Sequence, residues 1–336
     1  MIKKSLAKLA EGEDLTENEM IDTTKAIMEG CTSPAQIGSF LTALRLKGET
    51  VDEITGAARV MRDKSLKINL KAPIVIDTCG TGGDGAQTFN ISTTAAFIVA
   101  AAGIPVAKHG NRAISSRCGS ADVLEALGIK VDLPPEKVEQ SLAETGIGFL
   151  FAPRFHRAMK HASGPRKELG FRTVFNLLGP LTNPAAANCQ LVGVYHPKLT
   201  EVVAQVLQRL GLKRAVVVHG GGGLDELSLD GENKATILKD DQITTLRFQA
   251  ADLGLMSAPK EALGGGGPVE NARITLNILK GVEIGPRLAV VLLNAGAALL
   301  AADLVADLKA GIALAEKLVF EGKAYAKLEQ FRKVVG

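Results

Sequence analysis

The residues with the clearest chemical meaning lie in one glycine- and hydroxyl-rich stretch, Asp77-Thr-Cys-Gly-Thr-Gly-Gly-Asp-Gly-Ala-Gln-Thr-Phe-Asn-Ile-Ser-Thr93. An apolar run at 73–76, typical of a buried strand, precedes it, and an alanine-rich run at 94–102, typical of a helix, follows it. Glycine lets the backbone approach a ligand closely, and the free N–H groups of a helix N-terminus attract anions. The stretch therefore predicts a phosphate-binding loop. On the loop alone, a purely structural glycine turn is the alternative.

This loop differs from two common nucleotide motifs. It lacks the Gly-x-x-x-x-Gly-Lys-Ser/Thr pattern of a P-loop. Gly80, Gly82 and Gly85 have the Gly-x-Gly-x-x-Gly spacing of a dinucleotide fold, but several polar residues separate them from the helix. No acidic residue follows about 20 positions later, where that fold places one. The loop is thus predicted to bind phosphate in another way.

A second polar segment follows the apolar run near residue 106. Lys108 and Arg112 supply positive charge, and a helix is predicted to begin at Ser120. A solvated surface charge is the ordinary role of a single lysine or arginine, but this group follows a strand and adjoins a helix start. We therefore expect it to contact the ligand. Its hydrogen-bonding side chains are Asn111, Ser115 and Ser116.

Two further segments carry charged side chains. Arg166 suits a substrate carboxylate because its guanidinium is a rigid fork, and His156 lies ten residues before it. From the sequence alone, a surface arginine and a packed imidazole are the alternatives. Asp225 and Glu226 follow the apolar strand at 215–218, and Mg²⁺ prefers such oxygen ligands near phosphate. Adjacent carboxylates also commonly cap helices or stay solvated.

The elements that must position these residues change in kind along the chain. The first 70 residues predict helices only, with capping boxes at 16–19 and 50–53 and a Ser33-Pro34 helix start. From residue 73 onward, strands alternate with helices, which favours a mostly parallel, helix-covered sheet. The predicted strands are 73–77, 105–108, 191–195, 214–218 and 243–247, and the predicted helices include 93–102, 120–127, 199–210, 269–280 and 288–302.

Composition narrows the class of protein. A hydrophobic fraction of 46% over 336 residues permits a large core, while a net charge of +3 and 4% aromatic residues argue against nucleic-acid binding. The four cysteines form no CxxC pair, which argues against a zinc site, and no signal peptide is visible. The apolar run at 288–302 contains Asn294 and Gly296, so we expect a buried helix there and no membrane partner. These features predict a cytoplasmic protein with reduced thiols.

Four segments together make the chain similar to the anthranilate phosphoribosyltransferases, enzymes of tryptophan biosynthesis that join anthranilate to phosphoribosyl pyrophosphate (PRPP). The similarity extends from the N-terminal helices to the segment at 292–299. The four segments are Gly80-Thr-Gly-Gly-Asp-Gly through Thr93, Lys108-His-Gly-Asn-Arg112 with Gly119 to Gly128, Arg172-Thr-Val-Phe-Asn-Leu-Leu-Gly-Pro-Leu-Thr-Asn-Pro184, and Gly223-Leu-Asp-Glu-Leu-Ser228.

The resemblance implies an α/β fold of the nucleoside phosphorylase/phosphoribosyltransferase type. It implies a small helical domain at 1–72, joined by helices near 165–185, and a large α/β domain at 73–336 with a mostly parallel sheet. It also implies a homodimer that associates through the helical domains and a loop, 108–116, that closes over pyrophosphate. Two Mg²⁺ ions are the expected cofactors, and the expected partners are anthranilate and PRPP.

The resemblance also assigns residues, carried over position by position. Ser92, Asp225 and Glu226 are the implied metal ligands, and Lys108, His109 and Arg166 are the implied catalytic residues. Arg166 would bind the anthranilate carboxylate beside Gly80, Asn111 and His156. The implied PRPP site comprises Gly80, Gly83, Asp84, Thr88, Asn90, Ile91, Ser92, Thr93, Lys108, Ser115, Ser116 and Ser120.

Two departures from the family pattern lie on the acceptor side. Arg157 follows His156 where the family commonly has proline, and Gly164-Pro165-Arg166 replaces Pro-Val-Arg. We expect these changes to affect the pose of Arg166 more than phosphate binding. The alternatives to the family activity are a pyrimidine nucleoside phosphorylase-like enzyme and a non-catalytic, nucleic-acid-binding relative. The Asp225-Glu226 pair and the small net charge argue against them.

Overall fold

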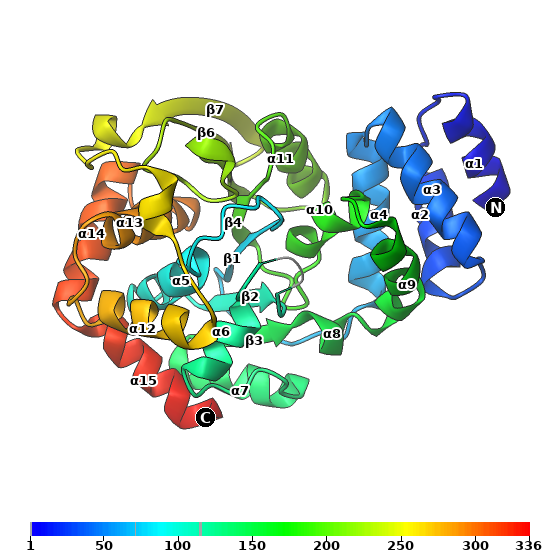
Figure 1. Cartoon of the computed structure of the whole chain (residues 1–336). Helices are drawn as coiled ribbons and strands as arrows, with labels where there is room; N and C mark the ends of the chain where they lie inside the picture. Colours follow the sequence, from blue (N-terminus) through cyan, green and yellow to red (C-terminus); the bar gives the residue numbers. More distant parts are fainter. Residues whose placement is uncertain (1, 71, 114–115) are drawn as a thin grey trace.

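The computed structural model describes residues 2–70, 72–113 and 116–336. Within these residues, seven strands form one sheet with the order β3-β2-β1-β4-β5-β6-β7 (Figure 1). Neighbouring strands are parallel from β3 to β5, whereas β6 and β7 are antiparallel to their neighbours. The strands are β1 (Ile76–Gly80), β2 (Val106–Gly110), β3 (Ile147–Phe151), β4 (Cys189–Gly193), β5 (Arg214–His219), β6 (Glu232–Lys239) and β7 (Gln242–Gln249).

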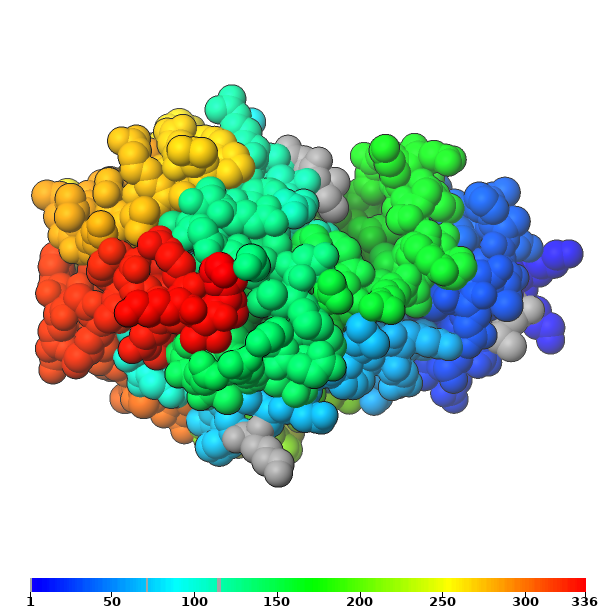
Figure 2. Space-filling view, turned by 90° about the horizontal axis from the view of Figure 1, so that it is seen from below, coloured from blue at the N-terminus to red at the C-terminus, as the bar shows by residue number. Residues whose placement is uncertain are grey.

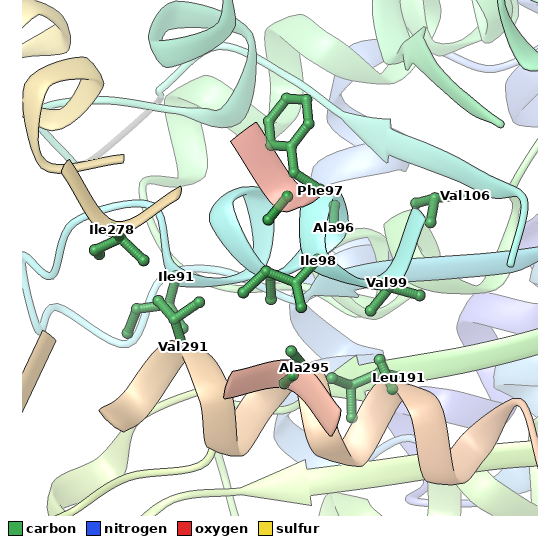
Figure 3. Packing of buried hydrophobic residues seen from close by; sticks show 14 of the residues in the cluster. Ile91, Ala96, Phe97, Ile98, Val99, Val106, Leu191, Ile278, Val291 and Ala295 are labelled. Atoms are coloured by element: carbon green, nitrogen blue, oxygen red, sulfur yellow. The ribbon is translucent and has the colours of Figure 1, made fainter. Parts of the chain in front are cut away.

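Two apolar helices form the centre of the core beside the sheet. Helix α5 (Ile91–Ala101) packs on α13 (Pro286–Ala301), and Figure 3 shows Val291 and Ala295 of α13 near Ile91 and Ile98 of α5. All four side chains are fully buried, so their removal from water stabilises the pair. The other helices of this region are α6 (Ser120–Ala126), α7 (Pro135–Thr145), α8 (Ala152–Phe155), α11 (Leu199–Arg209), α12 (Pro268–Leu279), α14 (Leu308–Phe320) and α15 (Lys323–Val335).

The N-terminal helices have the caps that the sequence predicts. Thr16, Ser33 and Thr50 each accept a hydrogen bond from the backbone three residues later, and each belongs to a complete capping box. Each box satisfies two N–H groups that a helix start would otherwise leave free. The helices are α1 (Ile2–Ala10), α2 (Glu17–Met28), α3 (Pro34–Lys47) and α4 (Val51–Lys64).

Two later helices return to this N-terminal group. Helix α9 (Lys160–Leu169) contacts α2 and α3, and α10 (Val174–Leu181) contacts α3 and α4. In Figure 2 the green surface around α9 lies against the blue surface of the N-terminal helices. We propose that residues 1–72 with these helices make the small domain and that the rest of 73–336 makes the large one.

The first strand differs from its predicted position. The strand lies at Ile76–Gly80, not at 73–77, so Asp77 is inside the sheet and fully buried. Its carboxylate accepts hydrogen bonds from the His109 N–H (3.1 Å) and from the Asn183 amide (2.7 Å). These partners explain how polar residues that suggest a loop can continue a strand.

Other elements were not predicted. Strand β3 is entirely buried and lies beside β2, while β6 begins and ends with charged residues, which obscures its strand pattern. The predicted strand at 191–195 begins two residues earlier, at Cys189.

The apolar run at 288–302 is the buried helix α13, as predicted, and none of the described helices combines the length and apolar character needed to cross a bilayer.

Candidate functional site

The site lies where the order of the strands reverses. From β1 the chain proceeds outward to β2 and β3 and then returns to the other side of β1 with β4. Open α/β sheets bind ligands at the carboxyl ends of the strands that flank such a reversal. Those ends are Gly80 of β1 and Gly193 of β4, which are paired in register.

The acidic pair, Asp225 and Glu226, follows β5, and its loop lies across the ends of β1 and β4. A Cβ atom on Gly80 would collide with the Asp225 carboxylate, and one on Gly193 would collide with the Asp225 carbonyl oxygen. The missing side chains therefore make room for this loop. Gly193 belongs to the site although the sequence analysis did not select it.

The two carboxylates contact the predicted phosphate loop directly. The Gly82 N–H donates to Asp225 Oδ2 (2.6 Å), and the Ser92 N–H donates to Glu226 Oε1 (3.2 Å). The Asp225 N–H donates to Asp84 Oδ2 at 3.4 Å. The carboxylates thus occupy N–H groups of the loop and of the first turn of α5, the groups that also bind anions.

Burial strongly affects the charge of this acidic pair. Burial, together with the negative charges of Asp84 and Glu226, raises the pKa of Asp225 well above its usual value. Burial also raises the pKa of Glu226 to about 7, against the opposing effect of the Lys108 ammonium. A bound cation would relieve this cost because it compensates charges that water no longer stabilises.

The donor set fits Mg²⁺ better than a softer metal. Across the described ranges, no group of three or more His, Cys, Asp or Glu side chains is arranged to hold a metal by itself. Mg²⁺ commonly uses one or two carboxylates and completes its shell with water and substrate phosphates. Asp225, Glu226 and the Ser92 hydroxyl offer only oxygen donors, which is what such a site needs.

Lys108 brings a positive charge to the same place. Its side chain is 4% exposed, and Nζ lies 3.3 Å from Ser92 Oγ while donating to the Thr78 carbonyl oxygen. A buried ammonium with few partners is well placed to meet a phosphate oxygen.

The glycine loop has the backbone freedom that the sequence suggests. Gly82, Gly83 and Gly85 have φ of 68°, 76° and 74°, a region that favours glycine. Thr88 forms a bridge with Gly264, and the Gly265 N–H donates to the Gln87 carbonyl oxygen at 3.0 Å. The glycine run at 264–267 therefore pairs with this loop.

The start of α5 combines buried and accessible groups. Ile91 and Thr93 are almost fully buried, so the Ile91 side chain belongs to the core and not to a ligand site. Asn90 receives a hydrogen bond from the Asn271 amide (3.0 Å) and donates to the Cys118 carbonyl oxygen (3.2 Å). Asn90 thereby links the glycine loop to the segment that follows β2.

That second segment is only partly as expected. The Asn111 carbonyl oxygen accepts from Ser120 Oγ at 3.2 Å, at the start of α6. Arg112 pairs with Glu125 (2.7 Å) and Asp122, so a ligand would compete with two carboxylates for its charge, and the expected ligand contact stays a prediction. Ser116 lies in the segment between Arg112 and Ser120. Ser115 lies outside the described residues.

Two buried histidines lie beside each other. The rings of His109 on β2 and His156 after α8 are 5.0 Å apart, and Nε2 of each has no hydrogen-bond partner among the described residues. His109 Nδ1 lies 3.0 Å from the Gly179 carbonyl oxygen; because that oxygen only accepts, Nδ1 carries the proton and Nε2 keeps a free lone pair. Burial lowers the pKa of His156 to about 3 and lowers that of His109, so both are neutral at pH 7.

Arg166 is half-buried on α9, with its guanidinium 5.2 Å from the ring centre of Phe175. Burial lowers its pKa, and no carboxylate of the described chain forms an ion pair with it. Its charge therefore remains available to an external anion. The departures are nearby: Arg157 is exposed, while Pro165 is buried inside α9.

Several residues of the site escaped sequence analysis. Asn183 donates to both Asp77 and the Ala107 carbonyl oxygen, each at 2.7 Å, and joins the segment after α10 to the sheet. Asn294 was seen only as an interruption of an apolar run. For Asn294, its position inside that run is the sequence feature that points to a buried role, because a buried amide requires partners. Asn183 stands between Thr182 and Pro184, and no such feature marks it.

Comparisons with known proteins agree with this architecture. Residues 3–65 match the helical bundle domain of a glycosyl transferase family, and residues 72–325 match its α/β domain. These matches confirm the predicted fold class: a helical unit followed by an α/β unit with a mostly parallel sheet.

Several relatives are similar over nearly the whole chain. The anthranilate phosphoribosyltransferase of Moorella thermoacetica is 57% identical over 329 residues, which cover 98% of this chain and 97% of the relative. The crystal structure of anthranilate phosphoribosyltransferase from Thermus thermophilus has a TM-score of 0.93 and 46% identity, and covers 98% of each chain. The Saccharomyces cerevisiae enzyme in complex with PRPP and Mg has a TM-score of 0.90 and 30% identity, with 99% of this chain and 97% of that chain covered.

Proposed function

The chain belongs to the family of anthranilate phosphoribosyltransferases, and we propose that its site transfers the phosphoribosyl group of PRPP to the amine of anthranilate. The products are N-(5-phosphoribosyl)anthranilate and pyrophosphate, and the reaction belongs to tryptophan biosynthesis. The observation that carries this proposal is the meeting of Asp225, Glu226, Lys108 and the α5 N-terminus at the β1/β4 reversal.

We propose that the glycine loop and the first turn of α5 bind PRPP. The positive end of the helix dipole favours its phosphates, as do the N–H groups of this segment other than those of Gly82 and Ser92, which bind Asp225 and Glu226; Lys108 adds a full charge. The contributing residues are Gly80, Gly83, Asp84, Thr88, Asn90, Ser92 and Thr93, with the backbone of Ile91, and Ser115, Ser116 and Ser120 from the second segment.

Asp225, Glu226 and Ser92 would hold the metal. When bound there, Mg²⁺ supplies compensation for the negative charge that develops on the departing pyrophosphate. We propose two ions, because the carboxylates meet the loop in two places: Asp225 at Gly82 and Glu226 at Ser92. The Saccharomyces cerevisiae structure with PRPP and Mg supports the type of ion.

We propose that Arg166 binds the carboxylate of anthranilate, with Gly80, Asn111 and His156 around the ring. An unpaired, half-buried guanidinium binds a carboxylate strongly because little water competes for it. A relative from Saccharomyces cerevisiae, with a TM-score of 0.89 and 29% identity, is known in complex with 4-fluoroanthranilate.

The chemistry follows from this placement. The amine nitrogen attacks the anomeric carbon of the ribose, the bond from that carbon to the pyrophosphate oxygen breaks, and the nitrogen then loses one proton. Holding both substrates in one cleft supplies the orientation. We propose that His109 Nε2 accepts the proton: a protonated aromatic amine is a strong acid, so a neutral imidazole of lowered pKa suffices.

We further propose a homodimer formed through the helical domains, working in the cytoplasm. The four cysteines are free thiols in the structure, which suits a reducing compartment.

The decisive experiment follows the fluorescence of anthranilate in the presence of purified protein, PRPP and Mg²⁺. We expect the fluorescence to fall only when all three components accompany anthranilate, with one pyrophosphate released per anthranilate consumed. Thymidine and uridine with phosphate serve as the comparison. Phosphorolysis of either without anthranilate turnover would contradict the proposal and favour the nucleoside phosphorylase-like alternative.

A further inference from the structure

Two buried asparagines hold the residues that follow the acidic pair. Asn294 lies on α13 and Asn233 on β6, and both side chains are 0% exposed. The two asparagines belong to elements far apart in sequence, yet they bind the backbone of consecutive residues. Asn294 binds Leu227, and Asn233 binds Ser228.

Asn294 binds Leu227 at two points. The Leu227 N–H donates to Asn294 Oδ1 and the Asn294 amide donates to the Leu227 carbonyl oxygen, both at 2.9 Å. The same amide also donates to the Val290 carbonyl oxygen at 2.9 Å, within its own helix. The amide therefore has a partner for its oxygen and two for its nitrogen, which is what a buried asparagine requires.

Asn233 repeats the arrangement one residue later. The Ser228 N–H donates to Asn233 Oδ1 at 2.7 Å, and the Asn233 amide donates to the Ser228 carbonyl oxygen at 2.9 Å. Two successive residues thus have both backbone groups fixed by side chains. This geometry leaves Leu227 and Ser228 little freedom to move.

The acidic pair needs such an anchor because repulsion among the carboxylates of Asp225, Glu226 and Asp84 favours their separation. Asp225 and Glu226 are adjacent carboxyl groups, and the Asp225 N–H binds the Asp84 carboxylate at 3.4 Å. Whenever these groups are ionised they repel one another, and the partly buried surroundings strengthen that repulsion. Without a cation the favourable response would be to move a carboxylate toward water. Asn294 opposes that movement because it binds Leu227, the residue after the acidic pair, and belongs to a helix that is fixed in the core. Figure 3 shows Val291 and Ala295 of this helix, α13, packed there.

We propose that Asn294 and Asn233 are positioning residues that hold Asp225 and Glu226 ready for the metal, and so set the affinity of the site for Mg²⁺. The inference rests on the proposed function, in which these two carboxylates bind the ion. Neither asparagine touches the substrates or the metal in this account. Outer partners that fix metal ligands typically contribute about 10- to 100-fold to metal affinity.

The test uses the full-length protein with Asn294→Ala and Asn233→Ala. Asn188→Ala is the control for losing the same pair of backbone contacts at an exposed position, because Asn188 also binds a backbone N–H (Val75, 2.9 Å) and a carbonyl oxygen (Pro73, 2.9 Å), but at the opposite end of β1. Mn²⁺ binding is followed by the loss of its free electron paramagnetic resonance signal. Amide hydrogen exchange at 227 and 228 is measured on the metal-free proteins.

In the wild-type protein without metal, we expect the amides of Leu227 and Ser228 to exchange as slowly as those of β1 and β4. In both variants we expect faster exchange there and a Kd for Mn²⁺ raised about tenfold or more. At saturating Mg²⁺ the KM for anthranilate should stay unchanged, because Arg166 is not affected. The control should match the wild type in all three measurements.

The wild-type exchange rates test the anchor even if Asn294→Ala does not fold. Fast wild-type exchange at both positions would overturn the inference. So would variants that bind Mn²⁺ as tightly as the wild type. A wild-type protein that binds no Mn²⁺ would overturn the metal assignment itself, and the inference with it.

Discussion

At the scale of single residues, the chemistry of the site comes from where ordinary side chains are buried. The same burial that raises the pKa of Glu226 to about 7 lowers that of His156 to about 3. In both cases water is removed from the charged form. The site thus presents neutral imidazoles where we propose that anthranilate binds, and carboxyl groups that favour a bound cation where we propose that PRPP binds.

Arg166→Ala should raise the KM for anthranilate about 10- to 100-fold, since a charge-assisted hydrogen bond to the carboxylate is lost. The KM for PRPP should change little, because the phosphate-binding residues lie on other elements. Steady-state kinetics with each substrate varied in turn measures both constants. Equal losses for the two substrates would contradict the assignment, and Arg166→Lys should recover only part of the binding.

His156 should make the protein sensitive to mild acid. Its pKa of about 3 in the folded protein is below the usual 6.5, so its contribution to stability is complete above pH 6.5 and is lost as pH falls toward 3. In His156→Gln, the free energy of unfolding should fall less steeply between these limits, by about 1.4 kcal/mol per pH unit, the value for one proton. Urea unfolding at several pH values checks this, and parallel curves for the two proteins would refute it.

At the scale of elements, the site depends on three segments whose backbones lie in direct contact: the ends of β1 and β4 and the loop after β5. Gly80 and Gly193 end neighbouring strands, and the loop after β5 lies directly on both. The glycine run at 264–267 contacts the phosphate loop through the bridge between Gly264 and Thr88. The position of the carboxylates is therefore a property of backbone packing as much as of their own side chains.

Gly193→Ala should displace the acidic loop, because the added methyl group would overlap the Asp225 carbonyl oxygen. We expect a loss of about 1–3 kcal/mol in the free energy of unfolding, with weaker Mg²⁺ activation. Gly38→Ala is the control: it lies in α3 with nothing within 4 Å of the new methyl group, so it should be neutral or stabilising by up to about 1 kcal/mol. Thermal unfolding and the Mg²⁺ dependence of activity distinguish the two.

At the scale of the whole molecule, the chain folds back to complete its helical unit. Helix α9, which carries Arg166, packs on α2 and α3, and α10 reaches the sheet, where the Gly179 carbonyl oxygen lies 3.0 Å from His109 Nδ1. Arg166 therefore belongs to a different packed group from the residues proposed to bind PRPP, whereas Gly80 and Asn111 of the proposed anthranilate site lie at or directly after strand ends of the sheet. Relative movement of the two groups would change the distance between the substrates.

Leu46 provides a test of the proposed dimer. Its side chain, near the end of α3, is 83% exposed and lies on the helical unit through which the dimer is proposed to form. Leu46→Lys should shift the protein toward a monomer of 35.2 kDa, measured by light scattering after size-exclusion chromatography. Val282→Lys, at a residue 67% exposed in the large domain, should leave the mass unchanged. The same mass for Leu46→Lys and the wild type would argue against this interface.

The sequence by itself determined the local features. Capping boxes, glycine spacing and the change from helix-only to alternating patterns predicted the N-terminal helices, the phosphate loop and the α/β class, because these depend on neighbours within a few residues. It also selected Asp225 and Glu226 as candidates, since charged residues after an apolar strand stand out in any sequence.

Only the tertiary structure decided which of these residues meet. The burial of Asp77 beside Asn183 and the anchoring of Leu227 by Asn294 join positions far apart in sequence, and the pairing of Arg112 with Glu125 depends on how the segment after β2 meets α6. Local sequence patterns carry no information about such pairings, because a buried polar group is stable only when a distant segment supplies its partner.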